Sequence, residues 1–203
     1  MIGLLLKDLI TLKDQGKMII VLLVFYSFIA VGSGNNLMFG MMIAILCAML
    51  PITVMGFDEK AKWDKYALSM PISRFEVVMS KYLLGICFFI LGFVVNVIFN
   101  LFTTSQGLMD IVEMSLGVVG IGVIYLCFVL PLLFKFGVEK GRFFLMLVMF
   151  IPLGIGILLN KLGFVMPPKE TIDTMMAFIP LLSIIIFFCS IGLSYSIYSK
   201  KEL

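Results

Sequence analysis

The chain consists mainly of apolar runs that are separated by short polar intervals. Six of these runs are candidate membrane spans: Met18–Val31, Leu37–Gly56, Tyr82–Phe102, Met114–Phe134, Phe143–Leu159 and Met175–Ile197. A helix needs ~20 apolar residues to cross a bilayer, so the first and fifth spans are expected to include flanking residues. Prolines occur in four of the spans and predict local kinks, which membrane helices tolerate. The pattern predicts an all-α integral membrane protein with one transmembrane domain, residues 1–203.

Residues 1–17 precede the first span and have an amphipathic pattern. Apolar side chains share one helical face and polar side chains the other, namely Ile2, Leu5, Leu6, Leu9 and Ile10 against Lys7, Asp8, Thr11 and Asp14. Only Leu4 breaks this division. A helix with such faces lies flat at the membrane surface. The sequence therefore predicts an N-terminal interfacial helix.

The longest polar interval, residues 57–81, follows the second span. Its first part combines alternating charges (Asp58, Glu59, Lys60, Lys62, Asp64, Lys65) with a narrow apolar stripe (Trp63, Ala67, Met70, with Tyr66 beside them). Opposite charges four residues apart fall on the same side of a helix, and the stripe has the 3.6-residue period of a helix. The pattern predicts a short amphipathic helix over Glu59–Met70.

The second part of this interval predicts a helix break and a new start. The residue before a proline is pushed out of the α region, so Pro71 is expected to end the first helix. The sequence Ser73-Arg74-Phe75-Glu76 fits the S-x-x-E capping box and predicts a helix that continues into the third span. The amphipathic helix itself has two equally weighted interpretations. It is either a solvated helix on the lipid headgroups or a docking helix for a soluble partner, with Trp63 as its anchor.

The basic residues are distributed unequally between the two sides of the predicted membrane. Thirteen of the fifteen lysines and arginines lie in the N-terminal segment, in the loops after the second and fourth spans, or at the C-terminus. The other two, Lys161 and Lys169, lie on the opposite side. Basic residues favour the cytoplasmic side of a membrane. Both termini and the segment 58–80 are therefore predicted to be cytoplasmic, in a multi-pass membrane protein.

Several classes of function lack their usual residues in this sequence. There is no G-x-x-x-x-G-K-[ST] motif for nucleotide binding, no G-x-S-x-G motif and no histidine. The four cysteines lie in apolar runs without a C-x-x-C motif, so neither a metal site nor a cofactor site is predicted. No charged residue lies deep in a span, which argues against an ion-coupled carrier. We expect a chain without enzyme activity of its own, whose energy source is a partner.

One polar stripe lies within the third span and at its end. Asn96 and Asn100 are four residues apart, and Thr103 and Thr104 follow one turn later. The first interpretation is that these side chains form hydrogen bonds with neighbouring helices. The alternative is that they line a transport path or an interface between protomers.

Two segments resemble the small bacterial permease subunits of type-2 ABC exporters, namely MIGLLLKDLITLK at the N-terminus and FDEKAKWDKYALSMPISRFEVVMSKYL after the second span. That family has an amphipathic helix on the inner leaflet. Its loop after the second span carries charged residues, a W-D-x-Y element, a P-[IV]-S-R turn and a lysine-tyrosine start of the third span. The matching residues are Asp58-Glu59-Lys60, Trp63-Asp64-Lys65-Tyr66, Pro71-Ile72-Ser73-Arg74 and Lys81-Tyr82. The size and layout are similar to those of permeases that export phenol-soluble modulins and related amphipathic peptides.

The resemblance implies a homo- or heterodimer of permeases bound to two cytosolic ATPase subunits, which would bind ATP and magnesium. The coupling residues that it implies are Asp58, Glu59, Lys60, Trp63, Asp64, Tyr66, Met70 and Arg74. The dimer would form the translocation path and export amphipathic peptides or other hydrophobic compounds, with no nucleic-acid partner. Two other classes stay open on the residues alone. They are an ATP-independent carrier or channel, and a non-transporting membrane scaffold or immunity protein.

Overall fold

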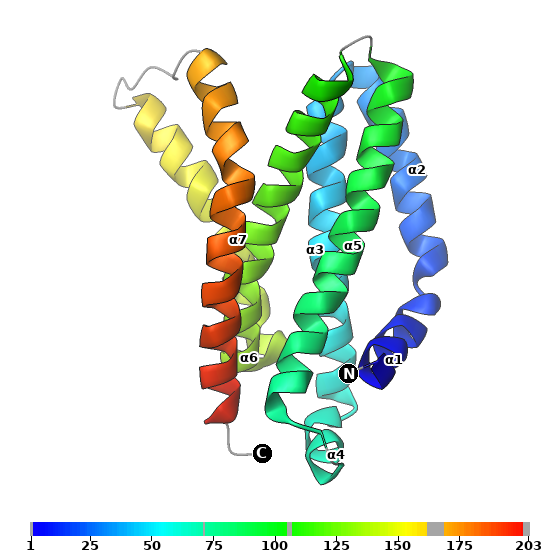
Figure 1. Ribbon diagram of the computed structural model, residues 1–203, viewed down its shortest axis with the longest axis vertical. Coiled ribbons are helices and arrows are strands. Elements are labelled where there is room, and N and C mark those ends of the chain that lie inside the picture. The colour runs from blue at the N-terminus through cyan, green and yellow to red at the C-terminus, as the bar shows by residue number, and fades with distance from the viewer. Residues whose placement is uncertain (1, 71, 105–106, 162–168, 201–203) are drawn as a thin grey trace.

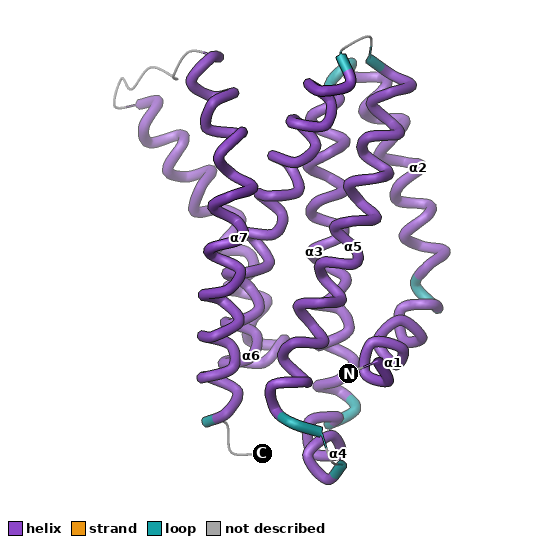
Figure 2. Tube along the Cα trace, viewed as in Figure 1, coloured by secondary structure: helices purple, strands orange, loops and turns teal. Residues whose placement is uncertain are grey.

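The computed structural model describes residues 2–70, 72–104, 107–161 and 169–200, which form helices with short connections (Figures 1 and 2). The helices are α1 Ile2–Lys13, α2 Gly16–Ser33, α3 Asn36–Lys60, α4 Trp63–Ser69, α5 Arg74–Thr103, α6 Leu108–Lys161 and α7 Lys169–Ser199. The long helices coincide with the apolar runs, because a helix satisfies its own backbone hydrogen bonds inside a bilayer. The prediction of an all-α protein is confirmed for the described residues.

Five helical stretches of the described residues are long and apolar enough to cross a membrane. They are α2, α3, α5, the part Leu108–Gly141 of α6, and the part Phe178–Ser199 of α7. These stretches correspond to five of the six predicted spans. The remaining predicted span, Phe143–Leu159, falls in the second part of α6, where many side chains lie outside the described part of the chain. The total of six spans therefore stays a prediction.

α6 consists of two helical segments that join at Gly137. The backbone of Gly137 has φ 78° and ψ 169°, a conformation that glycine adopts because it has no Cβ. Figure 1 shows the second segment, which ends in yellow, returning toward the end of the bundle at which α7 begins. The loop predicted between the fourth and fifth spans is thus a turn inside α6.

α3, α5 and the first segment of α6 form the centre of the bundle, and two glycines of α5 permit their close contact. A Cβ on Gly92 would lie 2.7 Å from Cys47 Sγ in α3, and a Cβ on Gly85 would lie 2.6 Å from Leu126 Cδ2 in α6. Both distances are too short for real Cβ atoms. α2 is peripheral, since only 6% of the residues in its apolar stretch are buried, whereas 56% are buried in that of α3. Most of the α2 surface is therefore open to lipid or to a second chain.

A hydrogen-bond network compensates the proline in the first segment of α6. Pro131 has no N–H, so the carbonyl of Cys127 one turn earlier lacks its helical donor. The Ser190 hydroxyl of α7 donates to this carbonyl at 2.5 Å. The Tyr82 hydroxyl of α5 lies 2.6 Å from Ser190 Oγ and 2.8 Å from Ser194 Oγ. The network joins α5, α6 and α7 inside the core.

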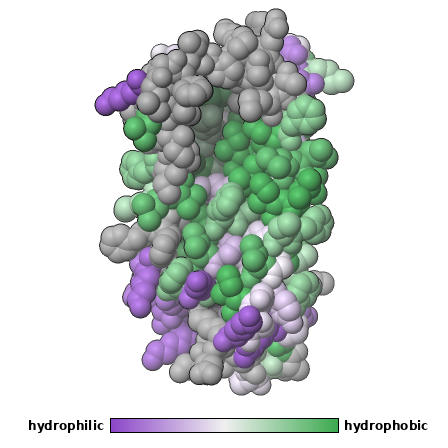
Figure 3. Space-filling view, turned by 90° about the vertical axis from the view of Figure 1, so that its left-hand side faces the viewer, coloured by the Kyte–Doolittle hydropathy of each residue, from purple (hydrophilic) through white to green (hydrophobic). Residues whose placement is uncertain are grey.

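α1, α4 and the C-terminal end of α7 lie at the same end of the bundle, which we call the α4 end (Figure 1). Figure 3 shows apolar side chains over the middle of the visible face, with most of its hydrophilic side chains gathered near the α4 end below. One strongly polar end agrees with the unequal distribution of basic residues. The assignment of this end to the cytoplasm stays a prediction.

The polar face predicted for α1 does not face water throughout. Leu9 and Ile10 are exposed, as an interfacial helix requires, but Asp8 is fully buried. Leu4 and Leu12, one turn on either side of Asp8, are buried with it. Residues spaced by four lie on one helical face, so Leu4 belongs to a stripe that packs on the bundle. Asp8 can be buried in this stripe because it pairs with a lysine of α5.

The helix predicted over Glu59–Met70 is interrupted. Glu59 and Lys60 belong to the last turn of α3, and Lys62 has a left-handed backbone with φ 51°. α4 therefore covers only the seven residues Trp63–Ser69. Asp58 and Lys62, whose spacing would place them on the same side of a continuous helix, form no ion pair. Asp58 pairs instead with lysines from α1 and α5.

The predicted break and restart after α4 are confirmed. Met70 is extended, with φ −94° and ψ 161°, as expected for the residue before Pro71. Ser73 caps α5 by accepting a hydrogen bond from the backbone of Glu76, whose carboxylate in turn accepts from the Ser73 N–H. Pro71 itself lies outside the described residues.

Candidate functional site

Four charged side chains from three helices meet at the α4 end, and we call them the charge cluster. They are Lys7 and Asp8 of α1, Asp58 of α3 and Lys81 of α5. Lys81 Nζ lies 2.8 Å from Asp8 Oδ2 and 2.6 Å from Asp58 Oδ2. Lys7 Nζ lies 2.5 Å from Asp58 Oδ1 and 3.0 Å from Asp8 Oδ1. Each carboxylate thus contacts both ammonium groups.

The charge cluster is unusual because its centre is buried. The Asp8 side chain is 0% exposed and that of Lys81 is 5% exposed, whereas Lys7 is 25% exposed. Two positive and two negative charges make the cluster formally neutral. Buried charges are tolerated when they are paired, and the loss of one partner then has a large cost. The charge cluster therefore holds α1, α3 and α5 in one arrangement.

Trp63 connects α4 to the charge cluster. Lys7 Nζ lies 4.5 Å from the centroid of the Trp63 ring, within the range of a cation–π contact. The ring is partly buried against the core, and Ala67 one turn later is fully buried. Tyr66 and Met70 instead are 61% and 46% exposed. The predicted apolar stripe is therefore divided between an inward side and an exposed side.

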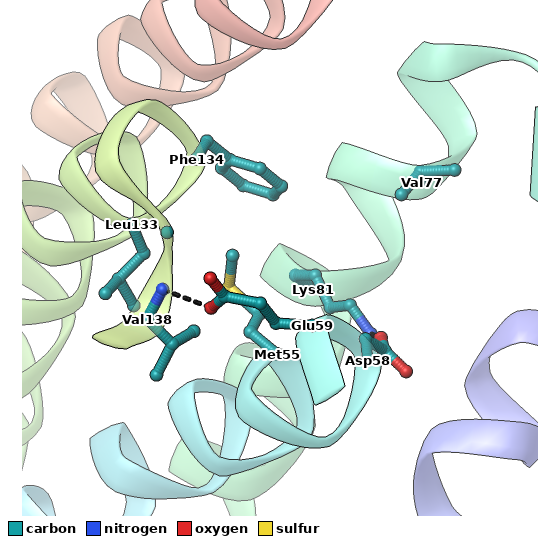
Figure 4. Close-up of a pocket in the computed structure, with 9 residues that line it drawn as sticks. Met55, Asp58, Glu59, Val77, Lys81, Leu133, Phe134 and Val138 are labelled. Carbon is teal, nitrogen blue, oxygen red and sulfur yellow. Dashed lines mark hydrogen bonds and ion pairs between the residues drawn. The ribbon is translucent and has the colours of Figure 1, made fainter. Parts of the chain in front are cut away.

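Glu59 connects the end of α3 to the second segment of α6. Its Oε2 accepts a hydrogen bond of 2.5 Å from the backbone N–H of Val138, the first residue after the turn at Gly137. A carboxylate at a helix N-terminus satisfies a free N–H and interacts favourably with the helix dipole. Gly137 also permits this approach, since a Cβ there would lie 2.5 Å from Glu59 Oε1. Figure 4 shows Glu59 reaching toward Val138, with Asp58 and Lys81 meeting beside it.

Arg74 connects the start of α5 to the end of α7. Its Nη1 donates to the carbonyl oxygen of Tyr198 at 3.3 Å and also to that of Ser199. These carbonyls belong to the last turn of α7, where helical donors are missing and a positive charge is favourable. The residues that flank α4 thus make contacts with α1, α5, α6 and α7.

A small cavity of about 40 Å³ lies among these contacts (Figure 4). It is lined by Met55, Asp58, Glu59, Val77, Lys81, Leu133, Phe134, Gly137 and Val138. This volume has room for only a few water molecules. The cavity is therefore a joint between α3, α5 and α6 and has no room for a transported compound.

The structure brings together some of the predicted coupling residues and adds others. Asp58, Glu59 and Arg74 contact other helices, while Lys60, Tyr66 and Met70 are exposed; the side chain of Asp64 lies outside the described part. The sequence reasoning missed Asp8, Lys81, Gly137 and Val138 as members of the site. The sequence does contain one indication that Asp8 is buried. Leu4, Asp8 and Leu12 are each four residues apart and therefore lie on the same face of α1.

The polar stripe of α5 divides in a similar way. Asn96 and Asn100 are 3% and 5% exposed, and Asn96 Nδ2 donates to Ser115 Oγ of α6 at 3.1 Å. Asn100 Nδ2 donates to the Asn96 carbonyl oxygen at 2.8 Å and to its Oδ1 at 3.1 Å. Thr103 is exposed, and the Thr104 hydroxyl accepts a hydrogen bond from Asn36 of α3. These contacts favour packing between helices, and the lining of a path stays a prediction.

Replacement of Asn96 and Asn100 by leucine separates the two interpretations. If the amides act in packing, the double variant loses the bond to Ser115 and crowds Gly40, where a Cβ would lie only 3.1 Å from Asn96 Nδ2. We therefore expect a lower midpoint of thermal unfolding of the purified protein. A path-lining role predicts instead normal unfolding and reduced export in vesicles.

Among the described residues, no group of three or more histidine, cysteine, aspartate or glutamate side chains could hold a metal ion. The carboxylates Asp8 and Asp58 are both engaged by lysines. The site therefore offers contacts between helices and an exposed surface on α4.

Comparison with known protein families supplies the wider context of this site. A family model described as ABC-2 family transporter protein matches residues 3–199, which is nearly the whole chain. No curated protein and no solved structure matches the chain in the corresponding comparisons. Members of this family are the non-catalytic membrane permeases of ABC-2 type transporters, whose ATP is bound by an ATPase partner. The chain belongs to the ABC-2 transporter family as a multi-pass membrane permease.

Proposed function

We propose that this permease is the membrane subunit of an ATP-driven exporter and that α4 is its docking element for a cytosolic ATPase. The observation that carries the proposal is the exposed side of α4. Tyr66 and Met70 present apolar surface away from the bundle, at the end of the molecule that is also rich in basic residues. Exposed aromatic and methionine side chains on a short helix are typical of a surface that binds a groove in a partner.

The orientation with the α4 end in the cytoplasm supports this role. The basic residues of the segments that meet there outnumber those predicted for the opposite side by thirteen to two, and such residues favour the cytoplasmic side. An ATPase subunit without membrane spans can reach α4 only from this side. The same orientation places both termini in the cytoplasm.

The contacts around α4 suggest how movement of the ATPase would reach the membrane. Trp63 transmits a displacement of α4 to Lys7 and the charge cluster, and therefore to α1 and α5. Glu59 transmits it to the second segment of α6 through Val138. Closure of two ATPases on ATP would then rock two permeases, like or unlike, and open the path between them outward.

The substrate class follows from the resemblance to exporters of amphipathic peptides. We propose that the cargo is an amphipathic peptide or another hydrophobic compound. The apolar interior and the absence of charged residues deep in the described spans agree with such a cargo, since an ion-coupled carrier usually needs a charged residue there.

The proposal is tested by purifying the permease from native membranes and measuring ATP turnover of the complex in lipid. We expect an ABC ATPase to be retained and its ATP turnover to respond to amphipathic peptides. Purification of the permease alone, combined with solute movement down a gradient without ATP, would show that it is an independent carrier or channel.

A further inference from the structure

A second and much larger cavity lies beside the small one, between α3 and the second segment of α6. Its volume is about 480 Å³, within the range of sites that bind drug-sized ligands. It is lined by Gln15, Met49, Ile52, Thr53, Gly56, Phe57, Lys60, Tyr125, Val138, Met146 and Phe150. Most of these side chains are apolar. The polar groups are few, which is typical of a site that orients an amphipathic ligand.

Two of the four polar residues that line this cavity lie toward the α4 end. Lys60 is the last residue of α3, and Gln15 lies between α1 and α2. Met49 is eleven residues before Lys60 in the same helix, so the cavity extends along α3 for about 16 Å. The cavity thus has its charged group at the α4 end, and most of its lining side chains farther along α3 and α6 are apolar.

The charge at the mouth is positive and has no partner among the described side chains. Lys60 is exposed and forms no ion pair or hydrogen bond with a described side chain, in contrast to Lys7 and Lys81 nearby. No acidic residue is among the lining residues of the described part. The Tyr125 hydroxyl is buried without a hydrogen-bond partner there. The cavity therefore offers one cation and polar donors, and no acidic side chain among its described lining residues.

We propose that this cavity binds a single-chain amphipathic anion, with its carboxylate or phosphate at Lys60 and its apolar chain between Met49, Met146 and Phe150. The inference rests on the proposed function, since it defines the charge and shape of the exported compound. A flexible methionine side chain adapts to different apolar chains, so the cavity selects mainly by the anionic group. One cation and one apolar stretch along α3 match one anionic group on one chain, and a two-chain phospholipid is an outcome that the test below distinguishes.

Photolabelling of the permease alone tests this site separately from the ATPase. The protein is placed in nanodiscs of phosphatidylcholine and exposed to a diazirine-bearing fatty acid or to the fatty amine of the same chain length. We expect the fatty acid to label peptides that contain the lining residues of α3 or the second segment of α6. The amine is expected to label them about tenfold less, because Lys60 repels it and cannot form a charge-assisted hydrogen bond with it.

Three variants define the contribution of the cavity. Lys60→Gln is expected to reduce labelling by the fatty acid about tenfold, whereas the matched change Lys62→Gln, outside the lining residues, leaves it unchanged. Gly56→Leu fills the cavity and is expected to abolish labelling; a Cβ at this position meets Val138 Cγ1 at an ordinary 3.5 Å, so the backbone there accepts a side chain. Thermal unfolding of this variant checks that the fold is intact.

Specific outcomes overturn the inference. Equal labelling by acid and amine, or no effect of Lys60→Gln, would show an apolar cavity without selection for an anion. Labelling elsewhere in the chain would remove the cavity from the binding site. Loss of labelling when phosphatidylglycerol replaces phosphatidylcholine would assign the site to a two-chain lipid instead. In each case an ATPase could still co-purify with the permease, so the proposed function would stand or fail on its own test.

Discussion

Replacement of Lys81 by methionine is expected to destabilise the permease by about 3–5 kcal/mol, the cost of leaving a buried charge without its partner. Lys81 Nζ contacts both carboxylates of the charge cluster, and Asp8 is completely buried beside it. Methionine keeps the length of the side chain but leaves two carboxylates with one lysine. The expected result is a lower midpoint of thermal unfolding for the purified protein in detergent or nanodiscs.

Two comparison variants make this result specific. Lys140→Met removes an exposed lysine at the same end of the bundle and is expected to have little effect. The double variant Asp8→Asn with Lys81→Met restores neutrality, since Lys7 and Asp58 remain paired. It is expected to be more stable than Lys81→Met alone. A double variant that is no more stable than the single one would show that packing of the Lys81 side chain, and not charge balance, accounts for the loss.

The periodic and local features of this chain are the ones that its sequence predicts well. The apolar runs predict the helices because the bilayer requires backbone hydrogen bonds to be made within the helix. The capping box at Ser73 and Glu76 depends on four consecutive residues and is present. The end of α4 before Pro71 likewise follows from a steric effect between neighbouring residues.

The contacts at the α4 end could not be predicted in this way, because they join residues far apart in the chain. Asp8 and Lys81 are separated by 73 positions, and nothing near Asp8 indicates that a lysine will cover it. In a helix at a membrane surface, the apolar face contacts lipid, so a charged residue can lie on the side that packs on protein. In soluble proteins the apolar face of an amphipathic helix packs on the core and its polar face contacts water. Asp8 is instead a charged residue on the face that packs on the protein.

The interruption of the predicted amphipathic helix has the same origin. Local spacing favours ion pairs of about 0.2–0.5 kcal/mol between residues four apart. Asp58 instead contacts two lysines in a partly buried site, where pairing is less screened than at the surface. The chain can therefore leave the helix at Lys62 and place Trp63 over Lys7. The division of α4 into an inward and an exposed side follows from this turn.

That division predicts different consequences for two aromatic residues of α4. Tyr66→Ala removes an exposed side chain and is expected to weaken binding of the ATPase by about 2 kcal/mol or more, roughly 30-fold, as for an aromatic hot spot of an interface. Its thermal unfolding should be unchanged, because Tyr66 is 61% exposed. Trp63→Ala is expected to lose the ATPase as well, but with reduced stability, since Trp63 contacts Lys7 and the core.

The measurement is retention of the ATPase on the tagged permease at decreasing protein concentration, together with thermal unfolding of each variant. Tyr195→Ala is the matched control, since Tyr195 is a 43% exposed tyrosine of α7 outside α4. Full retention of the ATPase by Tyr66→Ala and by a Tyr66→Ala, Met70→Ala double variant would contradict docking through this side of α4. The helix would then be a surface element that rests on lipid headgroups, and the coupling to the ATPase would have to pass through another part of the α4 end. Loss of the ATPase in Tyr66→Ala with normal unfolding would support direct docking. Removal of this exposed side chain would then leave the fold intact, so the lost binding would come from lost contact with the partner.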